Sequence, residues 1–284
     1  MAQIINTNIM SLNAQRNLSA TQSSLATSVQ RLSTGLRVNS AKDDAAGLAI
    51  AERMNTQVRG MNVAIRNAND AISLSQTAEG ALSKINDMGQ RMRELAVQSA
   101  NATNNDEDRK ALNQEYQALA EEIKRNLAGT SFNGTKLFAA GSALTFQVGA
   151  NNATTDQITI TTATMTGDTD LSNALGAMGA NAASAPGISS FTFATDALGK
   201  LDTMLAKINS KRAEFGAIQN RFQAVIENLQ VSAENQTAAR SRIMDADFAS
   251  ETASLTRSQV LQQAGTAMLS QANSLPNNVL SLLR

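Results

Sequence analysis

The 284-residue sequence contains no cysteine, no histidine and no tryptophan. A chain without cysteine and histidine cannot build a Cys–His nucleophile, a Ser–His–Asp triad or an ordinary zinc site. It also needs no disulfide for its fold, whichever redox compartment it occupies. Catalysis by carboxylates or lysine stays formally open. We therefore expect no enzyme, no metal site and no cofactor.

The sequence also lacks an excess of charge of either sign and any long apolar run. Lysine and arginine together number 24, as do aspartate and glutamate, so no bulk charge favours nucleic acid or an acidic membrane as partner. No apolar stretch reaches the roughly 18 residues that indicate a transmembrane helix. The first ten residues have no basic region followed by an apolar one. We expect no secretory signal peptide and no membrane insertion.

What is present is a coiled-coil pattern at both ends of the chain. Apolar residues at gaps of three, four or seven form one seam near each end: Leu18, Leu25, Val29, Leu32 and Leu36, then Leu261, Ala264, Met268 and Leu275. Stripes this narrow cannot bury themselves and need a partner helix from the same chain or from another copy. The pattern predicts an assembling subunit with a first helix over residues 9–35, which ends at Gly35.

Two further helices are expected before the centre of the chain. The first begins after Ser40, taken as its N-cap, and continues to about Ala100. Its roughly 55 residues would span about 80 Å at about 1.5 Å per residue, which is typical of a coiled-coil or bundle rod. The second follows the cap Asn105 and an acidic first turn, and ends near Gly129.

The centre has a different pattern, typical of short strands. Asn133-Gly134 predicts a hairpin turn, and residues 144–148, 158–160 and 191–193 alternate with period two. Residues 171–190, rich in alanine, glycine and serine, are interpreted as a loop. The helical period returns at Leu198 for a helix about half as long as the second one. A last helix is expected from near Asp245 to Ser274. Pro276 would interrupt or end it and leave an apolar tail of Val279, Leu280, Leu282 and Leu283.

The predicted fold is therefore mainly α with a small β region: an elongated antiparallel helical rod or coiled coil plus short β-hairpins. Residues 1–40 and 241–284 would form the two parts of one inner coiled-coil domain. Residues 41–130 and 196–240 would supply the rod helices, and residues 131–195 a short variable β/loop region.

Several acidic pairs have a plainer interpretation than catalysis or metal binding. Glu121 and Glu122 are adjacent on a helix and point about 100° apart, so they do not converge on one ligand. Glu121 is expected to pair with Arg125 at i,i+4. Asp43 belongs to a helix start. These carboxylates indicate surface support of helices.

Specific motifs add to the pattern. They are residues 32–52 (LSTGLRVNSAKDDAAGLAIAE), 90–103 (QRMRELAVQSANAT), 130–138 (TSFNGTKLF), 243–251 (IMDADFASE) and 278–283 (NVLSLL). In this order they closely resemble bacterial flagellin, over about residues 1–140 and 196–284. The resemblance implies a subunit that self-polymerises into the hollow flagellar filament used for swimming. The terminal helices would line its inner tube, with the rod helices outside them.

The resemblance also implies partners and a location. The unfolded chain would be exported by the flagellar type III apparatus with the help of an export chaperone. Cap and junction proteins would be further partners, and the location would be the extracellular filament. Arg91, Leu95 and Glu115 match positions recognised by the animal Toll-like receptor 5, and the tail from Val279 to Leu283 matches a segment sensed by cytosolic inflammasome receptors. Helix packing and subunit assembly are the plainer explanation of these residues, and we favour that explanation for the protein's own function. A hook–filament junction protein and a secreted coiled-coil effector remain the alternatives.

Overall fold

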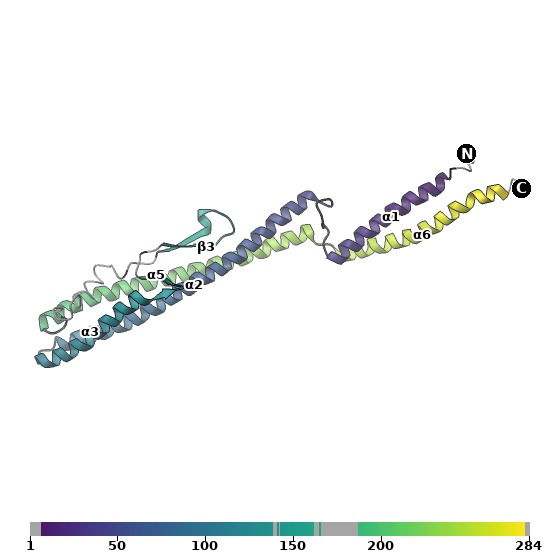
Figure 1. Ribbon diagram of the computed structural model, residues 1–284. Helices are drawn as coiled ribbons and strands as arrows, with labels where there is room; N and C mark the ends of the chain where they lie inside the picture. The colour runs from purple at the N-terminus through teal and green to yellow at the C-terminus, as the bar shows by residue number, and fades with distance from the viewer. Residues whose placement is uncertain (1–6, 139–140, 142, 162–164, 166–186, 282–284) are drawn as a thin grey trace. The chain divides into compact units, whose positions relative to one another are not determined.

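Residues 7–138, 141, 143–161, 165 and 187–281 are described by the computed structural model, with side chains given up to Ser274. Most of them are helical (Figure 1). The helices are α1 (Ile9–Thr34), α2 (Ala45–Ser99), α3 (Asp106–Gly129), the one-turn 3-10 helix η1 (Thr154–Asp156), α5 (Phe191–Met244) and α6 (Phe248–Ser281). The strands are β1 (Ser131–Phe132), β2 (Thr135–Lys136), β3 (Ala143–Gln147) and β4 (Gln157–Thr161). The predicted fold class, mainly α with a small β region, is confirmed.

The chain divides into two compact units. One contains Met1–Thr56 and Glu234–Arg284, and the other contains Gln57–Ala233. The boundaries expected from the sequence at residues 40 and 241 fall inside the first unit, beside the breaks between its helices. We call the first the terminal unit and the second the rod unit.

In the terminal unit, α1 and α6 run antiparallel along each other (Figure 1). Contacts between the two helices pair early residues of α1 with late residues of α6: Ser11 with Asn273, Leu18 with Gly265 and Arg31 with Glu251. Asn8 caps α1 by accepting a hydrogen bond from the Ser11 amide, and Gly35 ends the helix in the left-handed conformation at φ 73°. The predicted first helix is therefore confirmed at both ends.

The breaks that follow α1 and precede α6 are joined to each other within the same unit. Leu36 forms an isolated antiparallel bridge with Asp245, and the amide of Ala246 donates to the carbonyl of Gly35 at 2.9 Å. Beneath them Val38, Ala51 and Met244 form a small buried apolar cluster.

The start of α2 differs from the prediction. Ser40 does not cap the helix, because the Asp43 carboxylate accepts hydrogen bonds from the amides of Asn39 and Ser40 and closes a turn of its own. Asp44 takes the capping role instead and accepts a hydrogen bond from the Gly47 amide at 2.8 Å.

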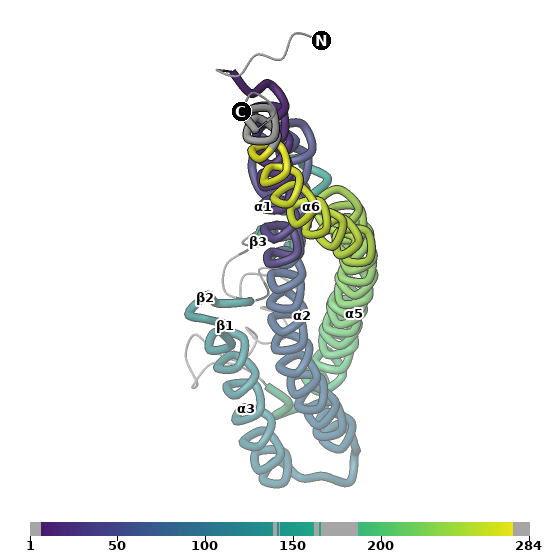
Figure 2. Tube along the Cα trace, turned by 90° about the vertical axis from the view of Figure 1, so that its right-hand side faces the viewer, coloured from purple at the N-terminus to yellow at the C-terminus, as the bar shows by residue number. Residues whose placement is uncertain are grey.

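In the rod unit, α2 and α5 are antiparallel and α3 lies beside α2 (Figure 2). Arg93 pairs with Asp202, Gly89 lies against Met204 and Leu205, and Glu79 accepts from Gln219, so residue numbers fall on one helix as they rise on the other. Asn105 and Asp108 form a reciprocal capping box at the start of α3, as the sequence predicted. The fully buried large side chains of this unit include Leu82, Ile85, Met92, Leu95, Tyr116, Ile123, Leu127, Leu137, Phe138, Ile160, Leu201, Met204, Ile208 and Phe222.

Two antiparallel hairpins complete the rod unit. Asn133 and Gly134 both have positive φ, 47° and 78°, and turn the chain from β1 into β2 as the Asn-Gly pair predicted. Strands β3 and β4 pair from Ala143↔Thr161 to Gln147↔Gln157. On β4 Ile158 and Ile160 alternate inward and are buried.

Three expectations about the C-terminal half are wrong. Residues 191–193 are not a strand but the first turn of α5, because the burial of Ala194, Ala197 and Leu201 follows helical spacing while Phe191 and Phe193 stay exposed. Helix α5 has 54 residues, nearly the 55 of α2 rather than half. Helix α6 continues past Pro276 to Ser281. The loop expected at 171–190 lies mostly outside the described residues.

Candidate functional site: the terminal helix pair and the rod surface

The contact between α1 and α6 is built from two facing heptad patterns. On α1 the residues turned toward α6 are Ser11, Ala14, Leu18, Thr21, Leu25, Ser28, Leu32 and Gly35, and all are buried or half-buried. On α6 they are Glu251, Leu255, Ser258, Gln262, Gly265, Leu269 and Ala272. The steps alternate between three and four residues on both helices, which is the geometry of a coiled coil.

The most buried positions of this seam hold small side chains, whereas its leucines, Leu18, Leu25, Leu32, Leu255 and Leu269, are only half-buried. Ser11, Ser28, Ser258 and Ala272 are its buried members, and each is small. Because burial stabilises in proportion to the apolar area removed from water, such a seam contributes less than one whose leucines are fully buried.

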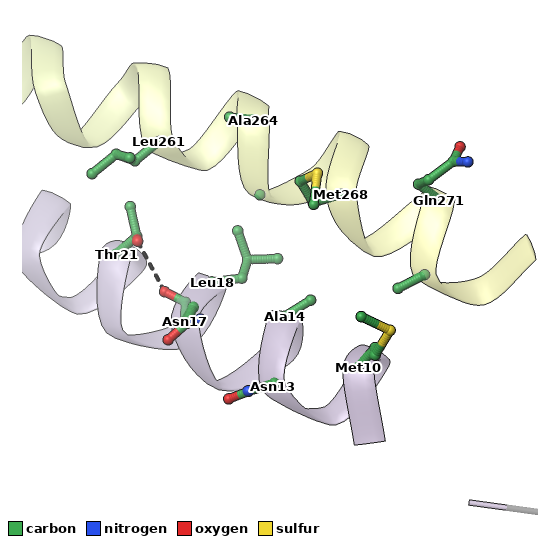
Figure 3. Close-up of a pocket in the computed structure, with 12 residues that line it drawn as sticks. Met10, Asn13, Ala14, Asn17, Leu18, Thr21, Leu261, Ala264, Met268 and Gln271 are labelled. Atoms are coloured by element: carbon green, nitrogen blue, oxygen red, sulfur yellow. Dashed lines mark hydrogen bonds between the residues drawn. The ribbon is translucent and has the colours of Figure 1, made fainter. Parts of the chain in front are cut away.

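A groove of about 460 Å³ runs between the two helices toward the ends of the chain (Figure 3). Met10, Ala14 and Leu18 of α1 line one wall. Leu261, Ala264, Gly265, Met268, Gln271 and Ala272 of α6 line the other. In Figure 3 the side chains of Leu18 and Leu261 lie in the space between the two helix ribbons. Most of this lining is apolar.

The residues predicted as seam members occupy different places around this pair. Leu18, Leu25, Leu32 and Leu36 are half-buried. Val29, Leu261, Ala264 and Met268 are exposed, Leu261 by 52% and Met268 by 65%. The predicted α6 seam lies one position before the more buried heptad and is therefore rotated by about 100° from it. The side chains of Leu275 and of the apolar tail, Val279, Leu280, Leu282 and Leu283, lie outside the described residues.

The terminal unit consequently carries many exposed large apolar side chains. They are Ile9, Met10, Leu12, Val29, Ile50, Phe248, Val260, Leu261 and Met268. Single exposed apolar residues are ordinary on protein surfaces, whereas all of these except Ile50 of α2 lie on α1 and α6 and together form a surface suited to contact with another chain.

A second candidate site lies on the rod unit, where α2 and α3 carry an ion-pair network. Arg91 donates from Nε to Glu115 at 2.8 Å and from its terminal guanidinium nitrogen to Glu94 at 3.0 Å. The hydrogen bonds to Glu115 and then to Glu94 raise the pKa of Arg91 above its ordinary value. Arg91 and Glu115 are each about half exposed, so the network is available to a partner.

Leu95, the third predicted recognition residue, lies in the interior. It is 1% exposed and belongs to the rod core with Met92 and Tyr116. The structure therefore brings Arg91 and Glu115 together on the surface and places Leu95 in the buried rod core instead.

Several acidic residues of the described chain form ion pairs with basic side chains, for example Glu122 with Arg125 and Asp202 with Arg93. Arg125 bonds to Glu122 at i,i+3, with 2.7 Å between Nε and Oε2, so the expected pairing with Glu121 is wrong. Among the described residues, no group of three or more acidic side chains is placed to hold a metal ion. A search of the same residues also found no helix with the length and hydropathy needed to span a bilayer.

Comparison with known families matches both ends of the chain. Residues 5–143 match the bacterial flagellin N-terminal helical region, and residues 198–283 match the bacterial flagellin C-terminal helical region. The two matches contain all of α1, α2, α3 and α6. They also contain most of α5, from residue 198 onward. The unmatched centre, residues 144–197, includes β4 and all of β3 except Ala143.

Whole-chain relatives agree with these family matches. The chain is 44% identical to a flagellin of Halalkalibacterium halodurans, over 99% of this chain and 100% of the relative. It is 42% identical to a flagellin of Bacillus subtilis, over 99% of both chains. A solved structure of a putative flagellar hook-associated protein from Vibrio parahaemolyticus shares the fold, with a TM-score of 0.58 and 12% identity over 72% of this chain and 100% of that one. The chain belongs to the bacterial flagellin family, whose members are the structural subunits of the flagellar filament.

Proposed function

We propose that the α1–α6 pair makes the contacts that join neighbouring subunits in the filament. The observation that carries this proposal is the set of exposed apolar side chains on these two helices, with Leu261 and Met268 beside the groove. The seam between α1 and α6 leaves its leucines half-buried, so contacts with other copies would complete its burial. Head-to-tail contacts that do not close into a ring generate an open helical filament.

A single introduced cysteine tests this proposal, because the natural chain has none. The substitution Met268→Cys places a thiol at a position that is 65% exposed in the single chain. We expect a thiol reagent to label this variant rapidly as a monomer and slowly after assembly into filaments. Equal labelling in both states would contradict a subunit contact at Met268. The unmodified, cysteine-free chain controls for non-specific labelling.

The choice between a filament subunit and a junction protein rests on the extent of assembly. The identity of 44% to a flagellin over the whole chain supports the filament role, whereas the likeness to a hook-associated protein extends to the fold alone. Seeded assembly followed by electron microscopy tests this role: long filaments are expected, and a chain that caps seeds without elongation would contradict it.

We also propose that the Arg91–Glu115 surface is the part of the rod unit that a host Toll-like receptor contacts. The half-exposed ion pair supports this role, and buried Leu95 would act through the position of α2 rather than by direct contact. The substitution Arg91→Ala should weaken receptor binding, measured with the monomer, while unfolding of the rod unit stays nearly unchanged. Undiminished binding by this variant would contradict the assignment.

The route to the filament is proposed from the same family relationship. The chain would leave the cell unfolded through the flagellar export apparatus, with an export chaperone, and join the filament end with cap and junction proteins. A chain without disulfides has no covalent obstacle to unfolding for export. Loss of extracellular protein in a strain that lacks the export apparatus is the expected result, and continued secretion would contradict this route.

A further inference from the structure

Helix α6 contains a proline where a helix ordinarily ends or kinks. Pro276 has no backbone N–H, yet α6 continues to Ser281. The carbonyl deprived of its helical donor is that of Ala272, four residues earlier. Ala272 is 7% exposed, so water has little access to this residue. A buried carbonyl without a donor would destabilise the helix, which leaves the question of what satisfies it.

The donor comes from the other end of the chain. The side-chain amide of Asn8 donates from Nδ2 to the Ala272 carbonyl at 2.7 Å. The oxygen of the same side chain accepts from the Ser11 amide at 3.1 Å and caps α1. Both polar atoms of Asn8 are thus engaged, one by the first turn of α1 and one by the last turns of α6.

A second hydrogen bond fixes the same register. The Ser11 hydroxyl donates to the Asn273 side-chain oxygen at 2.8 Å, and Ser11 is 7% exposed. Two successive residues of α6 are therefore bonded to two residues one turn apart on α1. A slip of either helix by one residue would break both bonds.

We propose that Asn8 supplies the hydrogen bond that Pro276 withholds, so that the start of α1 and the end of α6 become ordered together. The two ends of the chain form one cooperative element, and residues 277–281 continue as a helix because α1 is docked. Asn8 is a positioning residue in this account: it fixes the axial register of the helix pair that faces other subunits.

The test uses three full-length variants assembled into filaments: Asn8→Ser, Pro276→Ala and the double substitution. Serine caps helices about as well as asparagine but is too short to reach Ala272, so Asn8→Ser removes the bridging bond and keeps the cap. Alanine at 276 restores a backbone donor to the Ala272 carbonyl. Amide hydrogen exchange is measured in peptides that cover residues 273–281.

We expect Asn8→Ser to speed exchange in these peptides by a factor of about two to ten, the effect of losing one hydrogen bond. In the Pro276→Ala background the same substitution should have almost no effect. Unchanged exchange in Asn8→Ser would overturn the proposal, as would an equal effect in both backgrounds. If Asn8→Ser does not assemble, the double variant should recover assembly, and its failure to do so would also overturn the proposal.

Discussion

Gly265 of α6 packs against Leu18 of α1, so that a Cβ atom at position 265 would be 3.3 Å from the Leu18 Cδ1 atom. Glycine in a helix interior costs about 1 kcal/mol relative to alanine, so its presence here indicates a packing reason. The close approach of the two helices supplies that reason.

Substitutions at Gly265 should therefore separate helix propensity from packing. Gly265→Ala requires only a small shift of the flexible Leu18 end and gains helix propensity, so we expect filament stability within about 1 kcal/mol of the original. Gly265→Val should destabilise the helix pair by about 1–3 kcal/mol through overpacking. The temperature at which filaments depolymerise measures both. A valine variant as stable as the alanine variant would contradict close packing at this point.

Leu95 should matter for the stability of the rod unit rather than for surface recognition. Its side chain is 1% exposed, so Leu95→Ala removes buried apolar contacts and should lower the free energy of unfolding by about 2–5 kcal/mol. Val97, two residues later and 51% exposed, provides the matched control. Val97→Ala should change the free energy of unfolding by no more than about 0.5 kcal/mol. Thermal unfolding of the monomer followed by circular dichroism compares the two, and similar losses would refute the burial of Leu95.

Met268 should control assembly without controlling the fold. Met268→Asp places a charge on the apolar wall of the α1–α6 groove, where burial between subunits would require the removal of its water. We expect no elongation from seeds, with the unfolding temperature of the rod unit unchanged. Met268→Leu, which keeps an apolar side chain of similar volume, should elongate normally. Normal elongation by the aspartate variant would show that Met268 stays exposed in the filament.

The Arg93–Asp202 pair links α2 to α5 in a pH-dependent way. Arg93 Nε lies 2.7 Å from Asp202 Oδ1, and this hydrogen bond lowers the pKa of Asp202 below its ordinary value of 3.8. The ionised carboxylate is favoured in the folded chain, so its stabilisation is present above about pH 3.8 and is lost as the pH falls through the lower folded-state pKa.

Asp202→Asn should therefore be less stable than the natural chain near pH 6, with a difference that disappears well below pH 3.8. Both side chains are about half exposed, so the difference should be small and should shrink further in high salt. Denaturant unfolding of the monomer at several pH values provides the measurement. A difference that is constant across pH would mean that the charge of Asp202 is not involved.

Much of the helical architecture could be predicted because its signals are local. Gly35 ends α1 and the Asn105 capping box starts α3 through contacts within a few residues, and the Asn133-Gly134 turn is equally local. The alternation of Ile158 and Ile160 predicted β4 for the same reason.

The wrong predictions have two causes: a distant residue decides the structure, or small buried residues give a weak apolar signal. Pro276 does not end α6, and the Ala272 carbonyl that it leaves without a helical donor is satisfied by Asn8, which lies 264 residues away in sequence. The inward heptad of α6 differs from the predicted seam because its buried members Ser258 and Ala272 are small and give little apolar signal. The larger Leu261 and Met268 lie one position before the inward residues Gln262 and Leu269. Two phenylalanines at 191 and 193 resembled a strand, although buried alanines behind them carry the helical pattern of α5.

The central claim is that the terminal helices join subunits while the rod unit folds without them. Deletion of residues 250–284 tests it most directly, with seeded elongation followed by electron microscopy and unfolding followed by circular dichroism. The account predicts no filaments and a preserved unfolding transition of the rod unit, with a loss of helical signal only from the terminal helices. Filaments of normal length from the truncated chain would contradict the claim.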